Sequence, residues 1–501
     1  MIKNKILIAE VVPAVKLPRN VSQVFSYTIS PKMEKEVKTG KILEVPFRNK
    51  SVLGVVLDVK KEVSENIKFK LKEISSLQEK DLYLSDQQIQ LAKFISTYYY
   101  TPLSLVIKAI VPPLTKNKPR KKINLNYNCK IPDIKKTEIN KLLKKIEKKN
   151  KVLLIHNLQA ERHNLYSEII KKNIKAKAQT LILFPEYFDI YNFADFYKNK
   201  FKKEKIAILT SELTKNQYSS EWEKIKSANA QIIIGTRQAL FAPFRNLKLI
   251  ICDDENNSSY KQWDQNPRYH GIKTAQKLAE IFKAKIILSS TAPSVESYYL
   301  SKDPNQFSKI EYITKKFARN IDIVNMENDR KTGNYSALSE RLKENLLKNI
   351  YNKKQAIIFI PRLGKNTITK CRDCEYIAQC KNCENILILQ NNFLYCTRCK
   401  EKTNLIKQCP KCEGQRMNSF GYGSEEIQNE TEKLFEGKNI KIVRLDSSTT
   451  QKGTNQNKIQ TDFINGKIDI LIGTQMVLKN WNMENISTFA ILFPEIIFTQ
   501  S

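Results

Sequence analysis

Eight of the ten cysteines stand as four pairs within one short stretch of the chain, and two residues separate the members of each pair. The pairs are Cys371/Cys374, Cys380/Cys383, Cys396/Cys399 and Cys409/Cys412. This spacing lets both thiolates of a pair reach one ion from a tight turn, and four thiolates in a tetrahedral array are preferred by structural Zn²⁺. The four pairs therefore predict two structural zinc ions, with no position of either ion left open for catalysis.

The lengths between the pairs favour a nested arrangement of the two sites. Residues 384–395 are long enough for a hairpin that joins two CxxC turns, as in a zinc ribbon, and closing it brings the first pair beside the fourth. The predicted inner site is Cys380, Cys383, Cys396 and Cys399, and the predicted outer site is Cys371, Cys374, Cys409 and Cys412. A sequential arrangement, first pair with second and third with fourth, remains open. A disulfide framework is disfavoured, because Cys129 and Cys252 stand alone and no secretory signal precedes the cysteines.

Composition indicates a multidomain protein with a polyanionic partner. The 501 residues include 85 Lys plus Arg against 51 Asp plus Glu, a formal net charge of +34. Such an excess favours the phosphate backbone of nucleic acid, although the Lys, Ile and Asn bias of an AT-rich genome would supply part of it. No apolar run approaches the roughly 18 residues of a membrane span, and the start of the chain is a poor signal peptide. We therefore expect a soluble cytoplasmic protein without membrane contact.

The elements that position these residues follow from apolar periodicity. Alternation at 24–29, 41–47 and 51–57 predicts a β-rich N-terminal domain, followed by a helix over 85–95 with Ser85 as its N-cap. From residue 152 onward, short buried strands alternate with helices, which predicts parallel sheets covered on both faces. The first series of predicted strands is 152–155, 180–184, 205–209, 231–234, 247–252 and 285–288. The second series is 321–324, 356–360, 440–445, 468–472 and 489–493, and the cysteines interrupt it before a helix at 425–434.

Further motifs accompany this pattern: Phe25-Ser26-Tyr27, Val45-Pro46-Phe47-Arg48, and residues 98–100, 234–244, 258–262, 267–270, 444–446 and 472–477. Together with the cysteines they resemble the primosomal protein N′ family, the PriA replication-restart helicases, over nearly the whole chain. The resemblance implies an α/β fold with a small β-rich DNA-binding domain and two RecA-like helicase lobes, the second interrupted by a two-zinc cysteine module in the nested pairing. The implied boundaries are 1–113 for the DNA-binding domain, 114–151 for a basic linker in place of an intact winged-helix domain, 152–314 and 315–501 for the lobes, and 371–412 for the cysteine insertion.

The resemblance also locates a nucleotide site that departs from the family pattern. A phosphate loop needs glycines for close backbone approach, a lysine, and a Ser or Thr for Mg²⁺. Residues 156–164 (HNLQAERHN) contain no glycine. His163 falls near the lysine position and Asn164 near the Ser/Thr position, and a mostly neutral imidazole cannot replace a lysine ammonium. These residues are expected to be vestigial.

The remaining helicase motifs are also altered. Asp253 retains a carboxylate for metal, Asp254 stands where the family has Glu, and Glu255 follows it. Residues 479–482 (KNWN) depart from Lys-Gly-His-Asp, and the sequence ends at Ser501, ahead of the family's arginine-rich motif. Loss of a transition-state arginine alone costs on the order of 10³–10⁵ in rate. We therefore expect neither ATP–Mg²⁺ chemistry nor catalysis.

The predicted function is a DNA-binding replication-restart protein that recognises stalled or forked DNA and supports primosome assembly without unwinding it. The alternative is a residual DNA-dependent ATPase or helicase with a remodelled site, supported by Asp253, Arg237 and Gly473-Thr474-Gln475. The expected partners are branched, forked and single-stranded DNA, with other primosome proteins and single-strand-binding protein docking on the zinc module.

A resemblance to the family's binder of 3′ DNA ends assigns the DNA contacts. The matching residues are Phe25, Ser26, Tyr27, Gly40, Lys50 and Lys61. Rings would stack on a terminal base while lysines contact phosphate, although ordinary strand packing is an alternative for the two aromatic residues. Ser26 stands where the family favours Asp, so recognition of the 3′ hydroxyl is expected to be weakened or altered.

Overall fold

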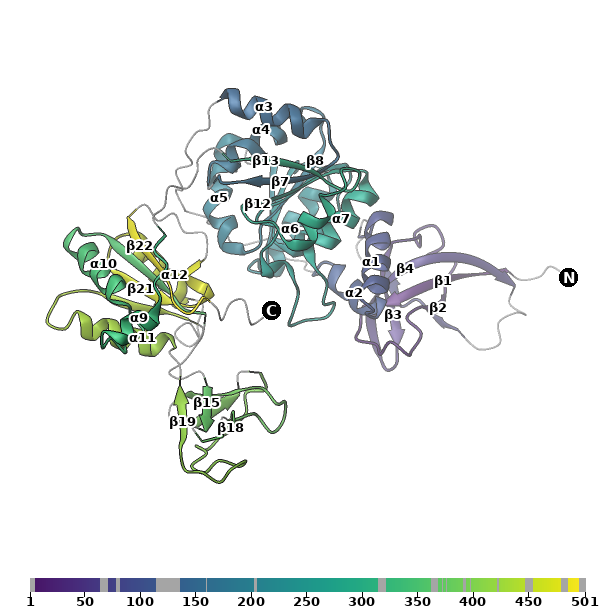
Figure 1. Cartoon of the computed structure of the whole chain (residues 1–501). Helices are drawn as coiled ribbons and strands as arrows, with labels where there is room; N and C mark the ends of the chain where they lie inside the picture. Colours follow the sequence, from purple (N-terminus) through teal and green to yellow (C-terminus); the bar gives the residue numbers. More distant parts are fainter. Residues whose placement is uncertain are drawn as a thin grey trace. The chain divides into compact units, whose positions relative to one another are not determined.

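The computed structural model (Figure 1) divides into two compact units, Met1–Ala318 and Arg319–Ser501. It describes residues 5–63, 71–77, 82–113, 136–158, 160–201, 205–313, 321–361, 368–371, 373–374, 376–390, 393–396, 398–420, 423–446, 454–478 and 485–494. Most of the predicted basic linker, the motif at 479–482 and Ser501 lie outside these ranges. Each unit has its own sheets and cores.

A six-stranded sheet opens the first unit. Its main strands are β1 (Lys5–Pro13), β2 (Phe25–Thr28), β3 (Ile42–Phe47) and β4 (Lys50–Val63), and the short β5 (Lys72–Glu73) and β6 (Ser76–Leu77) complete it. The strand order is β5-β2-β1-β4-β3-β6. The three strands expected here are confirmed, whereas the central strand β1 was not predicted.

Two helices connect this sheet to the next. In α1 (Asp86–Tyr98), Ser85 and Gln88 form a reciprocal capping box, which confirms Ser85 as the N-cap. The helix α2 (Leu103–Ile110) follows directly. The Gln88 side-chain amide donates to the Phe241 carbonyl at 2.8 Å, so α1 is fixed to the neighbouring layer as well as to its own sheet.

The larger sheet of the first unit has seven strands, each parallel to its neighbours. They are β7 (Lys151–His156), β8 (Gln179–Leu183), β9 (Ile206–Leu209), β10 (Ile232–Gly235), β11 (Leu247–Cys252), β12 (Lys285–Ser290) and β13 (Ser308–Tyr312). The order is β13-β7-β12-β11-β8-β10-β9. Six of these strands were expected, and β13 was not. Figure 1 shows the sheet in blue to teal tones with helices around it.

Alternate strand residues of this sheet feed two separate cores. Leu153 packs in the core that also contains residues of α1, α2 and α7 (Gly271–Phe282), while Val152 packs in the core with α3 (Lys136–Glu147), α4 (Arg162–Lys175) and α5 (Tyr187–Lys200). Near-continuous apolar strands are the expected consequence of burial on both faces. The predicted α/β architecture is confirmed.

The second unit is built on a four-stranded parallel sheet in the order β20-β21-β14-β22. Its strands are β14 (Gln355–Phe359), β20 (Ile442–Leu445), β21 (Ile470–Gly473) and β22 (Ile486–Ile491). The predicted strand at 321–324 is wrong. Ile321 and Ile323 are 81% and 94% exposed, and in the described part of the chain no neighbouring strand pairs with them. A segment with alternating apolar residues forms a β-strand only where a neighbouring strand offers an edge for hydrogen bonding.

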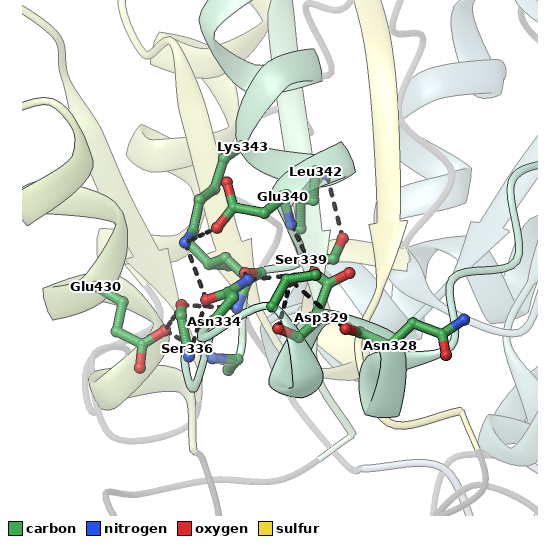
Figure 2. A network of polar contacts seen from close by, with 12 residues as sticks. Asn328, Asp329, Asn334, Ser336, Ser339, Glu340, Leu342, Lys343 and Glu430 are labelled. Carbon is green, nitrogen blue, oxygen red and sulfur yellow. Dashed lines mark hydrogen bonds and ion pairs between the residues drawn. The ribbon is translucent and has the colours of Figure 1, made fainter.

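A polar network fixes the start of α10 (Glu340–Tyr351), which follows α9 (Met326–Lys331) (Figure 2). The Asp329 carboxylate accepts from the Glu340 backbone N–H at 2.8 Å and from the Asn334 amide at 3.2 Å. Glu430, on α11 (Ser424–Leu434), accepts from the Ser336 hydroxyl at 2.6 Å. The carboxylates thus satisfy donors in the connection between the two helices.

The cysteine module lies in sequence between β14 and α11, as expected. It contains β15 (Ile368–Cys371), β16 (Leu387–Gln390), β17 (Phe393–Cys396), β18 (Lys402–Thr403) and β19 (Met417–Phe420). The strands β16 and β17 form the antiparallel hairpin predicted between the second and third cysteine pairs.

No described helix is suited to span a membrane by length and composition. The longest, α4 and α5, have 14 residues each, whereas a span needs about 20 apolar residues.

Candidate functional site

Three adjacent strands of the seven-stranded sheet bring the predicted nucleotide-site residues together. The strand β7 leads into α4 through residues 157–161, β11 leads into Asp253, and β12 ends at Ser289 and Ser290. Because β7, β12 and β11 are parallel neighbours, their carboxyl ends meet at one edge of the sheet. This is the edge at which open α/β sheets bind ligands.

At this edge the Asp253 carboxylate is already occupied by Arg162, the first residue of α4. Arg162 donates from Nε to Oδ1 at 2.7 Å and from Nη2 to Oδ2 at 2.7 Å, so the ion pair is bidentate. Arg162 is 8% exposed and Asp253 only 1%. The Tyr166 hydroxyl, 2.7 Å from Oδ1, donates a third hydrogen bond. Both oxygens of the Asp253 carboxylate therefore have hydrogen-bond partners within the protein.

The charges in this pair stabilise each other. Burial alone would raise the pKa of Asp253, but the charge of Arg162 and its hydrogen bonds outweigh burial and lower that pKa to about 2. Burial likewise opposes the positive charge of Arg162, yet Asp253 raises the net pKa of the guanidinium above its usual value. Both groups are therefore ionised at neutral pH, and the pair is a neutral unit inside the protein.

A chain of hydrogen bonds extends from the pair into the sheet. The Tyr166 hydroxyl lies 2.5 Å from Ser289 Oγ, which lies 2.9 Å from His156 Nε2. His156 Nδ1 accepts from the Leu158 N–H, so the neutral ring carries its proton on Nε2 and donates to Ser289. Burial, followed by the charge of Arg162, lowers the pKa of His156 to about 4.

His163 and Asn164, which the resemblance placed near the lysine and Ser/Thr positions, have Tyr197 and Lys200 as hydrogen-bond partners. His163 is fully buried, with Nδ1 2.9 Å from the Tyr197 hydroxyl and its ring centroid 3.8 Å from that of Phe193. Burial, and after it the Arg162 charge, lowers the pKa of His163 well below the usual value. Asn164 Oδ1 accepts from Lys200 at 2.9 Å. Arg162 was not among the residues predicted, and its place between Glu161 and His163 at the helix start was the available signal.

Glu255 is also committed to internal contacts. It accepts from the Ser294 backbone N–H at 2.7 Å and from the hydroxyls of Ser294 and Ser297 at 2.9 and 2.8 Å. It therefore fixes the start of α8 (Val295–Leu300). Asp254 has a left-handed backbone, φ 49°, and burial and the neighbouring Asp253 raise its pKa.

The residues that favoured a residual ATPase have structural partners. Arg237 donates to the Gln262 side chain and to the Ser259 carbonyl, both at 2.6 Å. In the second unit, Gly473 ends β21, and a Cβ at this position would lie 2.2 Å from the Leu445 carbonyl oxygen. Close backbone packing therefore accounts for this glycine.

The eight cysteines form two groups of four, each with its ligand atoms within 4.8 Å of one another, and each able to hold a metal ion. The outer cysteine centre is Cys371, Cys374, Cys409 and Cys412, and the inner cysteine centre is Cys380, Cys383, Cys396 and Cys399. This grouping is nested, as the spacing favoured, and not sequential.

The sulfur geometry of both centres suits a tetrahedral ion. In the outer centre Cys371 and Cys412 Sγ are 3.6 Å apart, and in the inner centre Cys383 and Cys396 Sγ are 3.4 Å apart. A tetrahedron with metal–sulfur bonds of about 2.3 Å has edges of about 3.8 Å. The backbone N–H of Cys399 also donates to Cys396 Sγ at 3.5 Å, a contact that favours the thiolate.

The predicted DNA-end residues do not all share one surface. Tyr27 is 4% exposed, its hydroxyl lies 3.4 Å from the Pro46 carbonyl oxygen, and burial raises its pKa. Phe25 packs edge-on against Phe47, with ring centroids 5.1 Å apart. Strand packing, the alternative left open for both aromatic residues, therefore describes Tyr27 well.

The remaining predicted contacts are dispersed. Ser26, Lys50 and Lys61 are exposed, but the two lysines lie near opposite ends of β4, about 35 Å apart along an extended strand. Gly40 is buried with φ 85°, and a Cβ there would lie 2.1 Å from the Leu84 carbonyl oxygen. Its role in the fold is to allow this close approach.

A second candidate nucleic-acid surface combines exposed aromatic rings with lysines. We call Tyr98, Tyr100 and Trp263, with Lys261 and Lys273, the aromatic ridge. The three rings are 56%, 75% and 67% exposed. Lys261 Nζ lies 5.7 Å from the Trp263 ring, and Lys273 Nζ lies 5.6 Å from the Tyr98 ring. Exposed rings among cations suit base stacking beside phosphate contacts. The sequence signal was the tyrosine run at 98–100, which had been noted only as a motif.

Comparison with known proteins places these sites in a family. The family model of the PriA 3′DNA-binding domain (3′BD) matches residues 14–112. The replication restart protein PriA of Helicobacter pylori is 31% identical over 459 residues, 90% of this chain and 70% of that protein. PriA of Bacillus subtilis is 30% identical over 349 residues, 68% of this chain and 43% of that protein, so the chain spans less than half of this relative. Among solved structures, the DUF1998 helicase MrfA bound to DNA covers 71% of this chain and 44% of its own, with 12% identity and a TM-score of 0.41. On the evidence of its curated relatives, the chain belongs to the replication restart protein PriA family.

Proposed function

We propose that this chain is a DNA-binding replication-restart protein that recognises stalled or forked DNA and supports primosome assembly without ATP-driven unwinding. The observation that carries the loss of unwinding is the buried Arg162–Asp253 pair. A metal–triphosphate would have to break this pair, and separating a buried ion pair leaves an uncompensated charge that costs about 3–5 kcal/mol.

The lack of glycine in the loop between β7 and α4 also opposes binding of a triphosphate. Backbone N–H groups cradle phosphates only where side chains do not block the approach, and the loop between β7 and α4 carries a side chain at every position. Glu161 adds a negative charge beside the place where a triphosphate would lie. The proposed chain therefore holds DNA and does not translocate on it.

DNA recognition is supported by the matched DNA-binding domain and by the aromatic ridge. We assign the DNA-binding role to residues 1–113, degenerate helicase lobes to 152–314 and 315–501, and a connecting segment to 114–151, whose helix α3 packs in the core of the first lobe. Stacking on the ridge fits single-stranded DNA. Phe25, Ser26 and Lys50 are proposed contacts near a 3′ end, and Lys61 is a proposed phosphate contact farther along the DNA.

We further propose that each cysteine centre holds one structural Zn²⁺. All four protein ligands of each centre are thiolates, which leaves no coordination position open for catalysis. The exposed face of this module, including Lys381, Arg398 and Lys407, is the proposed docking site for other primosome proteins or single-strand-binding protein.

The test measures fork-DNA binding and DNA-stimulated ATP hydrolysis with the same preparation of the protein. Tight binding of forked DNA without turnover is expected. The second candidate, a residual ATPase, is favoured by the retained and ionised Asp253. Turnover that Asp253→Asn abolishes would establish this candidate and overturn the first.

A further inference from the structure

The outer surface of α3 and the C-terminal end of α4 carries many exposed lysines. They are Lys136, Lys141, Lys144, Lys145, Lys148, Lys149, Lys175 and Lys177, and we call them the α3–α4 lysine surface. Within the described ranges, no ion pair joins any of them to a carboxylate. Among the residues that the structure describes, these cations therefore have no carboxylate partner.

Carboxylates near this surface already have other partners. Glu147 pairs with Lys172, and Glu168 pairs with Lys171 at 2.6 Å. Glu138 accepts from the Tyr312 hydroxyl at 2.6 Å. The surface is therefore strongly positive even after its acidic residues are counted.

Packing of α3 fixes which lysines point outward. Its buried residues are Ile139, Leu142, Leu143 and Ile146, and they pack in the core shared with α4. Lys141, Lys144, Lys145 and Lys148 follow the i, i+3, i+4, i+7 spacing of the opposite face. Figure 1 shows α3 alongside α4 at the edge of the first unit. Like charges at i and i+4 repel, so this row of lysines is most stable when an anion binds to it.

The length of α3 and the absence of aromatic residues from it indicate which kind of anion this surface would bind. The 12 residues of α3 extend about 18 Å, and duplex DNA presents one phosphate per about 1.7 Å of its axis, so several phosphates lie within reach of the helix. No aromatic residue occurs in α3, and Tyr166, the one tyrosine of α4, is buried. Single strands are held by stacking on exposed rings, which this surface lacks and the aromatic ridge provides.

We propose that the α3–α4 lysine surface binds the phosphate backbone of double-stranded DNA without sequence preference. The proposal rests on the proposed DNA-binding function and extends it. The ridge would take the single strand of a fork, and the lysine surface would take a duplex arm. Counterion release from that arm supplies the free energy.

The test is a salt titration of blunt-duplex binding by the full chain and by the variant Lys141→Gln/Lys144→Gln/Lys145→Gln/Lys148→Gln. Each lost phosphate contact should lower the slope of log affinity against log salt by about 0.9, so loss of four contacts lowers it by about 3.6. Binding to single-stranded DNA should change less than binding to duplex. Circular dichroism checks that the variant is folded.

The matched control is Lys224→Gln/Lys309→Gln/Lys343→Gln/Lys467→Gln. It removes the same net charge, but each of these lysines is paired with a carboxylate. A slope reduction of at least about 2 in the test variant and not in the control supports the proposal. A smaller reduction, or an equal one in the control, overturns it.

Two other results separate the alternatives. Loss of binding to phosphatidylserine vesicles with an unchanged duplex slope would overturn the proposal in favour of a lipid surface. If the unaltered chain binds neither duplex nor fork, the proposed function fails together with this inference; if it binds the fork and only the slope test fails, the inference alone is rejected.

Discussion

The sheet edge at Asp253 and the cysteine centres of this chain differ in what surrounds their potential metal ligands. At the sheet edge, both oxygens of Asp253 accept hydrogen bonds from Arg162. In the cysteine module, the eight cysteines form two groups of four, each able to hold a metal ion. The Asp253 carboxylate is thus satisfied by the protein itself, whereas the cysteine thiols are grouped as the ligands of an ion would be.

This difference shows which property each region supplies. An internal ion pair can replace a ligand in holding a fold together, because it satisfies the buried carboxylate without an external cation. The cysteine module has a small core, and a fold of this size ordinarily needs a metal ion to be stable, which is the role proposed for its two centres. The contrast argues for a chain that must fold and bind, but need not turn over ATP.

Removing metal should have the largest effect. Chelation is expected to unfold residues 371–412, since structural zinc contributes about 10–16 kcal/mol of apparent binding free energy per site at neutral pH. Metal analysis should find about two zinc ions per chain, and Cys396→Ala or Cys409→Ala should each lose one. Complete chelation without increased protease cleavage in the module would remove the structural role of the centres.

Breaking the Arg162–Asp253 pair should have the next largest effect. Arg162→Met is expected to lower the free energy of unfolding by about 3–5 kcal/mol, because it leaves Asp253 buried and unpaired. Adding Asp253→Leu should recover part of the loss, which denaturant unfolding can measure as a double-mutant cycle. Lys171→Gln, which breaks an exposed pair, is the control and should cost at most about 1 kcal/mol. If Arg162→Met lowers the free energy of unfolding by no more than this control does, the Arg162–Asp253 pair is not strong enough to keep a nucleotide out of the site.

Acid should destabilise the first unit through the histidines around the pair. The folded pKa of His156 is about 4, below the ordinary value of 6.5, so protonation favours the unfolded chain. Stability is therefore complete above pH 6.5 and should fall by about 3 kcal/mol as the pH decreases towards 4. Asp253, with a folded pKa of about 2 against 3.8, adds a further loss between those two values.

The variant His156→Gln isolates this contribution. Its unfolding free energy should decrease less steeply between pH 6.5 and 4, although buried His163 keeps a contribution of the same sign. Identical pH profiles for the two proteins would show that His156 is exposed to solvent.

The smallest expected effects concern DNA contacts. Tyr100→Ala and Trp263→Ala should each weaken single-stranded DNA binding by about 5- to 100-fold, since stacking contributes about 1–3 kcal/mol per base. Tyr27→Phe should change affinity by less than about twofold, because its hydroxyl is buried. Fluorescence anisotropy measures the affinity of each variant. A larger loss for Tyr27→Phe than for Tyr100→Ala and Trp263→Ala would indicate that Tyr27 is the DNA contact.

Local patterns predicted much of this fold. The Ser85 cap depends on residues within one turn, and the strands of the large sheet are apolar because both faces are covered, so both could be inferred from neighbouring residues. The nested cysteine grouping followed from loop length. Each of these features depends on residues that lie near one another in the sequence or are joined by one short loop.

Features that depend on distant partners could not be predicted in this way. The segment 321–324 has the alternation of a strand, yet it lacks a partner edge in the described part of the chain. The role of Arg162 depends on Asp253, which is far away in sequence and adjacent only once β7 and β11 lie in one sheet. Tyr27 and Phe25 alternate as a binding strand would, but the register with β1 turns Tyr27 into the core.

Calorimetric titration of the unaltered chain with Mg²⁺–ATP, in the presence of saturating forked DNA, tests the sealed site most directly. We expect bound DNA and no saturable nucleotide binding, because Arg162 already occupies both oxygens of Asp253. Saturable Mg²⁺–ATP binding that Asp253→Asn eliminates would contradict it.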